Sequence, residues 1–139
     1  MVCVCVSQSE LQWDKKDDIM GGLSWDPIVL HKRETLGMSF QSLTTICNLQ
    51  TMTALRELDV GGNELSSLPP ELFALPLTAL DLSRSDVNGA LPDALWGMTT
   101  LRVLAIVECG LRELPASLFE LRGLVELNVS KNPLGVLSP

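Results

Sequence analysis

The side chains in this 139-residue chain best suited to binding a metal ion are its four cysteines and its single histidine. A structural zinc ion takes four such ligands, and the candidate set is Cys3, Cys5, His31 and Cys47. Their spacing does not fit, because zinc sites pair ligands as Cys-x₂₋₄-Cys, whereas one residue separates Cys3 from Cys5. Fifteen residues separate His31 from Cys47. We therefore predict ordinary thiols, no bound metal and no cofactor.

Two other patterns of enzyme chemistry are incomplete in this sequence. Cys47 and His31 supply a nucleophile and a base, but no local signature of a cysteine-dependent enzyme surrounds either residue. The pair Gly61-Gly62 is not followed by the Gly-Lys-Ser/Thr sequence that completes a phosphate-binding loop. We therefore expect neither nucleophilic catalysis nor nucleotide binding.

Asp59 and Asp81 are the carboxylates whose spacing best suits acid–base chemistry. On neighbouring strands of one sheet their side chains would lie roughly 5 Å apart. At that distance the pKa values of two carboxyl groups can separate, as they do in general acid and base pairs. An open sheet face has no pocket that excludes water, however, so we predict that the chain is not an enzyme and has no catalytic residues.

Length, charge and composition restrict the classes of protein and partner. The chain is one domain long, and its 46% hydrophobic content is that of a folded protein. Its net charge of −7 repels nucleic acids and anionic membrane surfaces. No apolar run reaches the roughly 20 residues of a membrane-spanning helix, and the first residues lack the basic flank of a secretory signal. We therefore expect a cytoplasmic protein with reduced cysteines, and no nucleic-acid or membrane partner.

The elements that must position these residues repeat along the chain. Four copies of one pattern begin at Leu55, Leu77, Leu101 and Leu124, with spacings of 22, 24 and 23 residues. Each copy has apolar residues at its first, fourth, sixth and eleventh positions. A small side chain occupies the ninth position, and the four residues there are Asn63, Ser85, Cys109 and Asn132. Such a fixed period is the mark of a repeat architecture.

Each copy predicts a strand, a turn and a short helical return. The alternation between the fourth and sixth positions is that of a strand, and the small residue at the ninth position suits a turn. A Leu-Pro pair recurs later in three copies, with its prolines at Pro69, Pro92 and Pro115. The apolar residues that follow are three apart, as in a 3₁₀ or helical turn. One copy cannot bury its apolar side alone, so the copies must stack.

This pattern, L-x-x-L-x-L-x-x-N-x-L-x-x-L-P-x-x-L-x-x-L, resembles the leucine-rich repeat family. The resemblance implies an α/β fold: a short, curved, right-handed solenoid with a parallel β-sheet on its concave side and short helical or 3₁₀ segments on its convex side. The 23-residue period with Leu-Pro is similar to intracellular, Ras-group repeats. The stretch Gly89-Ala90-Leu91-Pro92 is similar to plant-type repeats, so the subfamily stays open.

The sequence predicts two parts in the chain. Residues 46–139 form the repeats, with a lead-in at 46–54, copies starting at 55, 77, 101 and 124, and a truncated last copy. Residues 1–45 carry no repeat, and we expect either a cap over the first coil or a leader. Bulk for such a cap is available from Trp13, Trp25 and Phe40.

The last copy stops before its helical return, which leaves an apolar edge. We expect its apolar side chains to be only half covered, namely those of Leu127, Val129, Leu134 and Leu137. Two interpretations follow: the chain is a fragment of a longer array, or another molecule covers this edge, including a second copy of the chain.

Strand alternation also predicts which side chains face the concave surface. Because Leu58 and Val60 point inward, the residues between them point outward. Applied to every copy, and extended to the next residue towards the rim, this rule selects Glu57, Asp59, Gly61, Asp81, Ser83, Arg84, Val103, Ala105, Val107, Glu108, Glu126, Asn128, Ser130 and Lys131, with Ala79 and Gly62 in the same rows. The surface is acidic at its N-terminal end and apolar around Val103.

The resemblance implies that these concave residues bind a partner, and we predict non-catalytic protein–protein interaction as the function. An acidic patch beside an apolar strip fits a protein segment that is basic and partly apolar. The alternatives are a solvated surface without a partner, and the recognition fragment of a larger signalling enzyme, such as a receptor-like kinase or a ubiquitin ligase.

Overall fold

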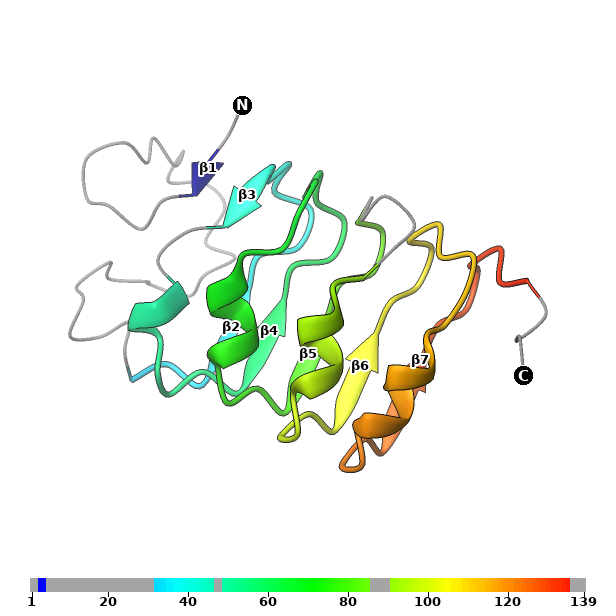
Figure 1. The fold of residues 1–139 in the computed structure, drawn as a ribbon. Helices are drawn as coiled ribbons and strands as arrows, with labels where there is room; N and C mark the ends of the chain where they lie inside the picture. Colours follow the sequence, from blue (N-terminus) through cyan, green and yellow to red (C-terminus); the bar gives the residue numbers. More distant parts are fainter. Residues whose placement is uncertain (1–2, 5–31, 47–48, 86–90, 136–139) are drawn as a thin grey trace.

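The protein forms one parallel five-stranded sheet, each strand coming from one coil of the chain. The structure is a computed structural model, and it describes residues 3–4, 32–46, 49–85 and 91–135. The strands follow the order β2-β4-β5-β6-β7 across the sheet (Figure 1). Their bounds are Thr35–Gly37 for β2, Glu57–Asp59 for β4, Ala79–Asp81 for β5, Val103–Ala105 for β6 and Glu126–Asn128 for β7. The last four strands occupy the third to fifth positions of the four copies, as the alternation predicts.

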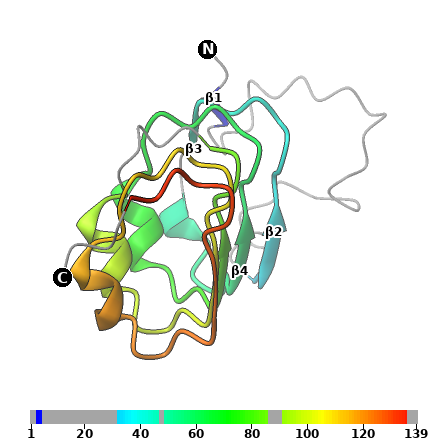
Figure 2. The same ribbon diagram turned by 90° about the vertical axis from the view of Figure 1, so that its right-hand side faces the viewer.

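Short 3₁₀ helices cover one face of this sheet and leave the other face open (Figures 1 and 2). They are η1 at Leu49–Thr51, η2 at Pro70–Ala74, η3 at Asp93–Gly97 and η4 at Ala116–Glu120. An extended proline precedes each of the last three, and these prolines are Pro69, Pro92 and Pro115. The predicted solenoid is therefore confirmed. No helix in the described part of the chain is long and apolar enough to cross a bilayer.

The sheet begins one coil earlier than the repeat pattern indicates. Strand β2 pairs in parallel with β4, and Leu36 lies opposite Leu58. Counting back from this register, the extra coil starts at Arg33, and its fourth, sixth and eleventh residues are the buried Leu36, Met38 and Leu43. This strand lies within the segment 1–45 that the sequence assigns to a non-repeat part. The pattern hides the coil because Arg33 replaces the first leucine.

A small second sheet lies at the N-terminal end. Strand β1 at Cys3–Val4 pairs in parallel with β3 at Thr45–Ile46. Strand β3 follows the turn of the first coil, so the beginning of the chain is joined to that coil by backbone hydrogen bonds (Figure 1). Trp13 and Trp25, expected as bulk for a cap, lie outside the described residues. Phe40 is 66% exposed instead of anchoring the core.

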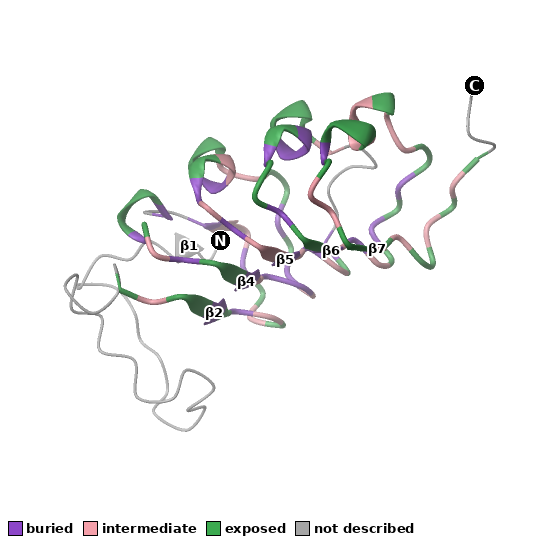
Figure 3. Ribbon diagram, turned by 90° about the horizontal axis from the view of Figure 1, so that it is seen from below, coloured by how far each residue is buried: buried purple, intermediate pink, exposed green. Residues whose placement is uncertain are grey.

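The core is a continuous stack of apolar side chains between the sheet and the 3₁₀ helices. Figure 3 colours the buried residues along the ribbon purple. The residues at the first, fourth and sixth positions are buried in the copies that start at 55, 77 and 101. Trp96 is 1% exposed, so it is packing and not a surface platform. In the last copy Leu127, Val129 and Leu134 are only partly buried, as predicted. Leu137 lies outside the described residues.

Asparagine at the ninth position ties its coil to the coil before it. Asn63 is 3% exposed, and its Oδ1 accepts hydrogen bonds from the backbone N–H of Gln41 and Leu43, at 3.0 and 3.1 Å. Its Nδ2 donates to the carbonyls of Met38 and Val60, at 2.8 and 2.7 Å. One amide thus satisfies backbone groups that neither turn could satisfy alone.

The other ninth positions vary this contact. Asn132 repeats it, accepting from the N–H of Cys109 and Leu111 at 2.8 and 3.1 Å. The thiol of Cys109 donates to the carbonyl of Leu82 at 3.2 Å. Ser85 is 1% exposed, and its Oγ is buried without a hydrogen-bond partner. Serine is too short to reproduce the bridge that asparagine makes.

Replacing Asn63 by alanine should lower the free energy of unfolding by about 2–4 kcal/mol, because several buried backbone groups lose their partners at once. Urea denaturation followed by circular dichroism measures this change. The neighbouring exposed Glu64→Ala serves as the control and should stay within about 0.5 kcal/mol of the parent. An Asn63→Ala protein as stable as the control would contradict the role given to the ninth position.

Introducing asparagine at a ninth position that lacks it should stabilise the protein. Ser85→Asn places an amide where a buried hydroxyl lacks a partner, and it should raise the free energy of unfolding by about 1 kcal/mol. The same denaturation measurement applies. Ser85→Ala is the matched control, since it removes the hydroxyl without adding an amide and should not reproduce the gain of the asparagine. Equal stability of the two variants would count against this prediction.

Candidate functional site

The concave face, meaning the sheet face opposite the 3₁₀ helices, holds an open groove of about 330 Å³. The groove crosses the first four strands of the sheet, β2, β4, β5 and β6. Its polar lining includes Glu57, Asp59 and Asp81, and its apolar lining includes Val103 and Ala105. Acidic and apolar side chains predicted for this surface thus line one groove, with the carboxylates on its middle strands, β4 and β5, and not at its N-terminal end, because β2 adds a strand before them.

Strand pairing aligns the predicted residues in rows that run across the strands. In the first row the register joins Glu57, Ala79, Val103 and Glu126. In the second row it joins Asp59, Asp81, Ala105 and Asn128. The third row follows the strand ends and consists of Gly61, Ser83, Val107 and Ser130. Gly61 is buried and has no side chain to offer, so its predicted contact with a partner could involve only its backbone.

The acidic side chains of the second row also shape the turns after the strands. Oδ1 of Asp59 accepts a hydrogen bond from the N–H of Gly61 at 2.9 Å, and Oδ1 of Asp81 accepts one from Ser83 at 2.8 Å. Asn128 makes the same turn with Ser130 at 3.2 Å. A neutral asparagine thus fits this position, so the fold does not require the negative charge. The negative charges of Asp59 and Asp81 can therefore interact with groups outside these turns.

The two carboxylates converge over Gly61. A Cβ atom added to this glycine would lie 3.3 Å from Oδ1 of Asp59 and 3.5 Å from Oδ1 of Asp81. The groove around them is open, so it offers no pocket in which one carboxyl group could be kept protonated as a catalytic acid. The arrangement concentrates negative charge where a cationic side chain could approach from solvent.

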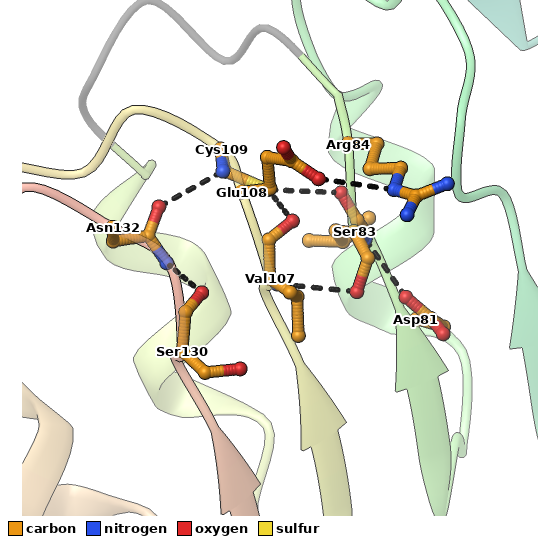
Figure 4. A network of polar contacts seen from close by, with 9 residues as sticks. Asp81, Ser83, Arg84, Val107, Glu108, Cys109, Ser130 and Asn132 are labelled. Atoms are coloured by element: carbon orange, nitrogen blue, oxygen red, sulfur yellow. Dashed lines mark hydrogen bonds and ion pairs between the residues drawn. The ribbon is translucent and has the colours of Figure 1, made fainter.

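The rim of the concave face is set by a left-handed corner at the eighth position of every coil. The φ angles there lie between 55° and 66°, and in chain order they are 56° for Phe40, 66° for Gly62, 55° for Arg84, 59° for Glu108 and 58° for Lys131. We call these five residues the rim row. Nε of Arg84 lies 3.1 Å from Oε2 of Glu108, an ion pair about half exposed to solvent (Figure 4).

Phe40 is the member of the rim row that the sequence does not place there. Its ring lies 5.8 Å from the guanidinium carbon of Arg84. It passes over Gly62, where a Cβ atom would lie 2.4 Å from Cδ1 of the ring. The signal in the sequence is its position, 22 residues before Gly62, but this becomes visible only once the degenerate first coil is known.

The candidate metal ligands do not form a described site. Cys5, His31 and Cys47 lie outside the described residues, and Cys3 belongs to the short strand β1. Within the described part of the chain, no three His, Cys, Asp or Glu side chains lie close enough together to hold a metal ion.

Cys109 is a free, buried thiol at the ninth position of its coil. Burial raises the pKa of this thiol above its ordinary value, and the nearby carboxylates of Asp81 and Glu108 act in the same direction. Backbone hydrogen bonds from Ser85 and Arg84 oppose the shift but are outweighed by burial. A raised pKa disfavours the thiolate, so Cys109 is suited to packing and hydrogen bonding and unsuited to nucleophilic attack.

Comparison with known proteins agrees with this architecture. The Leucine Rich Repeat family profile matches residues 54–75, which is the first clear copy together with its return. A solved leucine-rich repeat protein of Leptospira interrogans superimposes with a TM-score of 0.74 and 30% sequence identity, covering 81% of this chain and 28% of that one. The chain belongs to the leucine-rich repeat family.

Curated relatives are other leucine-rich repeat proteins of much greater length. The chain is 30% identical over 122 residues to transforming growth factor beta activator LRRC33 of Danio rerio, covering 77% of this chain and 17% of that protein. It is 36% identical over 91 residues to podocan-like protein 1 of Mus musculus, covering 63% and 16%. It is 42% identical over 81 residues to receptor-like protein 50 of Arabidopsis thaliana, covering 55% and 9%. The chain thus spans less than one fifth of each of these relatives.

We expect Cys109 of this leucine-rich repeat chain to react with iodoacetamide more than about tenfold more slowly in the native protein than in urea, because local opening must precede reaction. Mass spectrometry of the peptide that contains Cys109 measures the rate. The rate should rise with pH, since only the thiolate reacts. Equal rates in native and unfolded protein would contradict the buried, packing role of this thiol.

Proposed function

We propose that this leucine-rich repeat chain is a non-catalytic protein-binding module that takes its partner on the concave face. The observation that carries the proposal is the groove across β2, β4, β5 and β6. Carboxylates from β4 and β5 line the middle of this groove, and Val103 on β6, which is 37% exposed, lies beside them. Charged and apolar groups within one open depression are typical of a surface that recognises another protein.

The partner that complements this face is basic and partly apolar. Three acidic side chains, Glu57, Asp59 and Asp81, line the groove, and no basic side chain lines the part of it that the structure describes. Complementary charge accelerates association and selects against acidic partners. The charge of Asp59 and Asp81 is not needed for their turns, as Asn128 demonstrates, and this supports a role in binding.

A second candidate function is recognition within a larger signalling protein. The chain spans less than one fifth of the relatives it resembles, and one of these is a receptor-like protein. In this alternative the same concave face selects the ligand, and a separate part of a receptor-like kinase or ubiquitin ligase transmits the signal. Both candidates predict the same contact residues.

Two further expectations about partner and location accompany the proposal. The part-buried apolar residues of the last coil, together with Val125, which is 82% exposed, make a second copy of the chain a further candidate partner at that edge. The net charge of −7 argues against nucleic acid and anionic membranes as partners. We place the protein in the cytoplasm, where a free thiol such as that of Cys109 stays reduced.

The proposal is tested with peptides selected from a random 12-residue library displayed on phage and panned against the purified chain. We expect selected peptides to contain lysine or arginine together with apolar residues. The double variant Asp59→Asn, Asp81→Asn should bind them about tenfold more weakly, which corresponds to about 1.4 kcal/mol. The asparagines keep the turn hydrogen bonds and remove only the charge, and fluorescence anisotropy measures the affinity.

The matched control removes two carboxylates from the opposite side of the molecule. Glu71 and Glu120 are exposed in η2 and η4, so Glu71→Gln, Glu120→Gln changes the net charge equally without touching the groove. This control should bind the peptides like the parent chain. If both double variants lost affinity equally, the effect would come from overall charge, and the assignment of the concave face would be wrong.

A further inference from the structure

Phe40 combines an exposed aromatic ring with a left-handed backbone conformation. Its ring is 66% exposed to solvent. Its backbone has φ 56°, a left-handed conformation that is uncommon for a bulky residue. The same corner is taken by Gly62, Arg84, Glu108 and Lys131 in the later coils, so the conformation belongs to the fold. What distinguishes Phe40 is an exposed aromatic ring at the rim of the concave face.

The ring is nevertheless held in place. It lies on the backbone of Gly62, where no Cβ atom is present to displace it, and the guanidinium carbon of Arg84 lies 5.8 Å from the ring centroid. Arg84 also forms a 3.1 Å ion pair with Glu108 (Figure 4). Contacts with Gly62 and Arg84 thus favour one position of the ring before any partner arrives. Such preorganisation lowers the entropic cost of binding.

This aromatic surface adjoins the acidic groove. The backbone N–H of Phe40 donates to the carbonyl of Gly61 at 2.9 Å. The N–H of the same Gly61 donates to the carboxylate of Asp59. One glycine therefore links the aromatic ring at the rim to the carboxylates of the concave face.

We infer that Phe40 is the apolar anchor point of the proposed binding face, and that it takes a large apolar or aromatic side chain from the same protein segment whose basic residue lies over Asp59 and Asp81. The inference rests on the proposed function. It adds which part of the face binds the apolar residue of the partner and which part binds the basic residue. We expect an apolar side chain at the ring in preference to a cation, because the guanidinium carbon of Arg84 already lies 5.8 Å from the ring centroid. The basic residue therefore goes to the carboxylates and the apolar residue to the ring.

The test uses the phage-selected peptides and two ways of removing the ring. Phe40→Ala deletes it, and peptides selected on the parent chain should bind at least about tenfold more weakly. Phe119→Ala is the matched control, because Phe119 is 83% exposed in η4 on the opposite side of the sheet. It should leave affinity unchanged.

The second way keeps the ring and takes away its support. Gly62→Ala introduces a methyl group that would lie 2.4 Å from the ring, so the ring must move and affinity should fall. Gly110→Ala is its control: Gly110 has φ +71°, and nothing lies within 4 Å of an added Cβ atom. Both variants place alanine at a positive φ. A loss of affinity in Gly62→Ala alone would therefore result from displacement of the ring.

The role of Arg84 in keeping basic peptide residues away from the ring is tested separately. Arg84→Gln removes the cation near the ring. A selection repeated on this variant should accept lysine or arginine at the peptide position that is apolar for the parent. An unchanged requirement for an apolar residue would overturn the role given to Arg84.

The outcomes separate this inference from the proposed function. If Phe40→Ala and Gly62→Ala bind like the parent while Asp59→Asn, Asp81→Asn binds weakly, the concave face stands and the anchor role of Phe40 is wrong. If only the two ring variants lose affinity, the acidic groove is not the binding face and the rim alone binds. If none of them loses affinity, both ideas fail.

Discussion

Asn63, Cys109 and Asn132, each at the ninth position of its coil, bind the backbone of the preceding coil, and this contact stabilises the stacking of the coils. The strands of the five-stranded sheet have three residues each, too short for a sheet to form from strand pairing alone. Asn63 and Asn132 supply the missing order, because one amide joins the carbonyls and N–H groups of two successive turns. With the turns aligned, the apolar residues of each copy meet those of the next.

Alignment of the turns also determines the open face. Once the coils are stacked in register, the outward residues of each strand form rows, and the left-handed corner that follows each strand forms the rim. The fold fixes the places of these residues but does not determine which side chain occupies each place. Asn128 makes the same turn as Asp59 and Asp81, so an acidic residue there reflects something other than folding. The same reasoning applies to Phe40, whose corner would accept glycine.

An open face of this kind suits recognition better than chemistry. Catalysis by paired carboxylates needs a site that excludes water, and the groove beside Asp59 and Asp81 is open along its length. Recognition needs a broad surface with charged and apolar parts in fixed relation, and the rows provide this. The buried Cys109 illustrates the difference, since its raised pKa suits a hydrogen-bonding role within the stack.

The sequence by itself determined the repeating unit. Strand, turn and 3₁₀ return could all be predicted, because apolar spacing, a small ninth residue and the Leu-Pro pairs act within one copy of about 23 residues. The contacts between residues of different coils were decided by the tertiary structure. The coil that begins at Arg33 is recognisable only because Leu36 pairs with Leu58, and Phe40 reaches Arg84 only because Gly62 between them has no side chain. Such contacts join residues far apart in the chain, and their formation depends on the stacking of coils rather than on local preference.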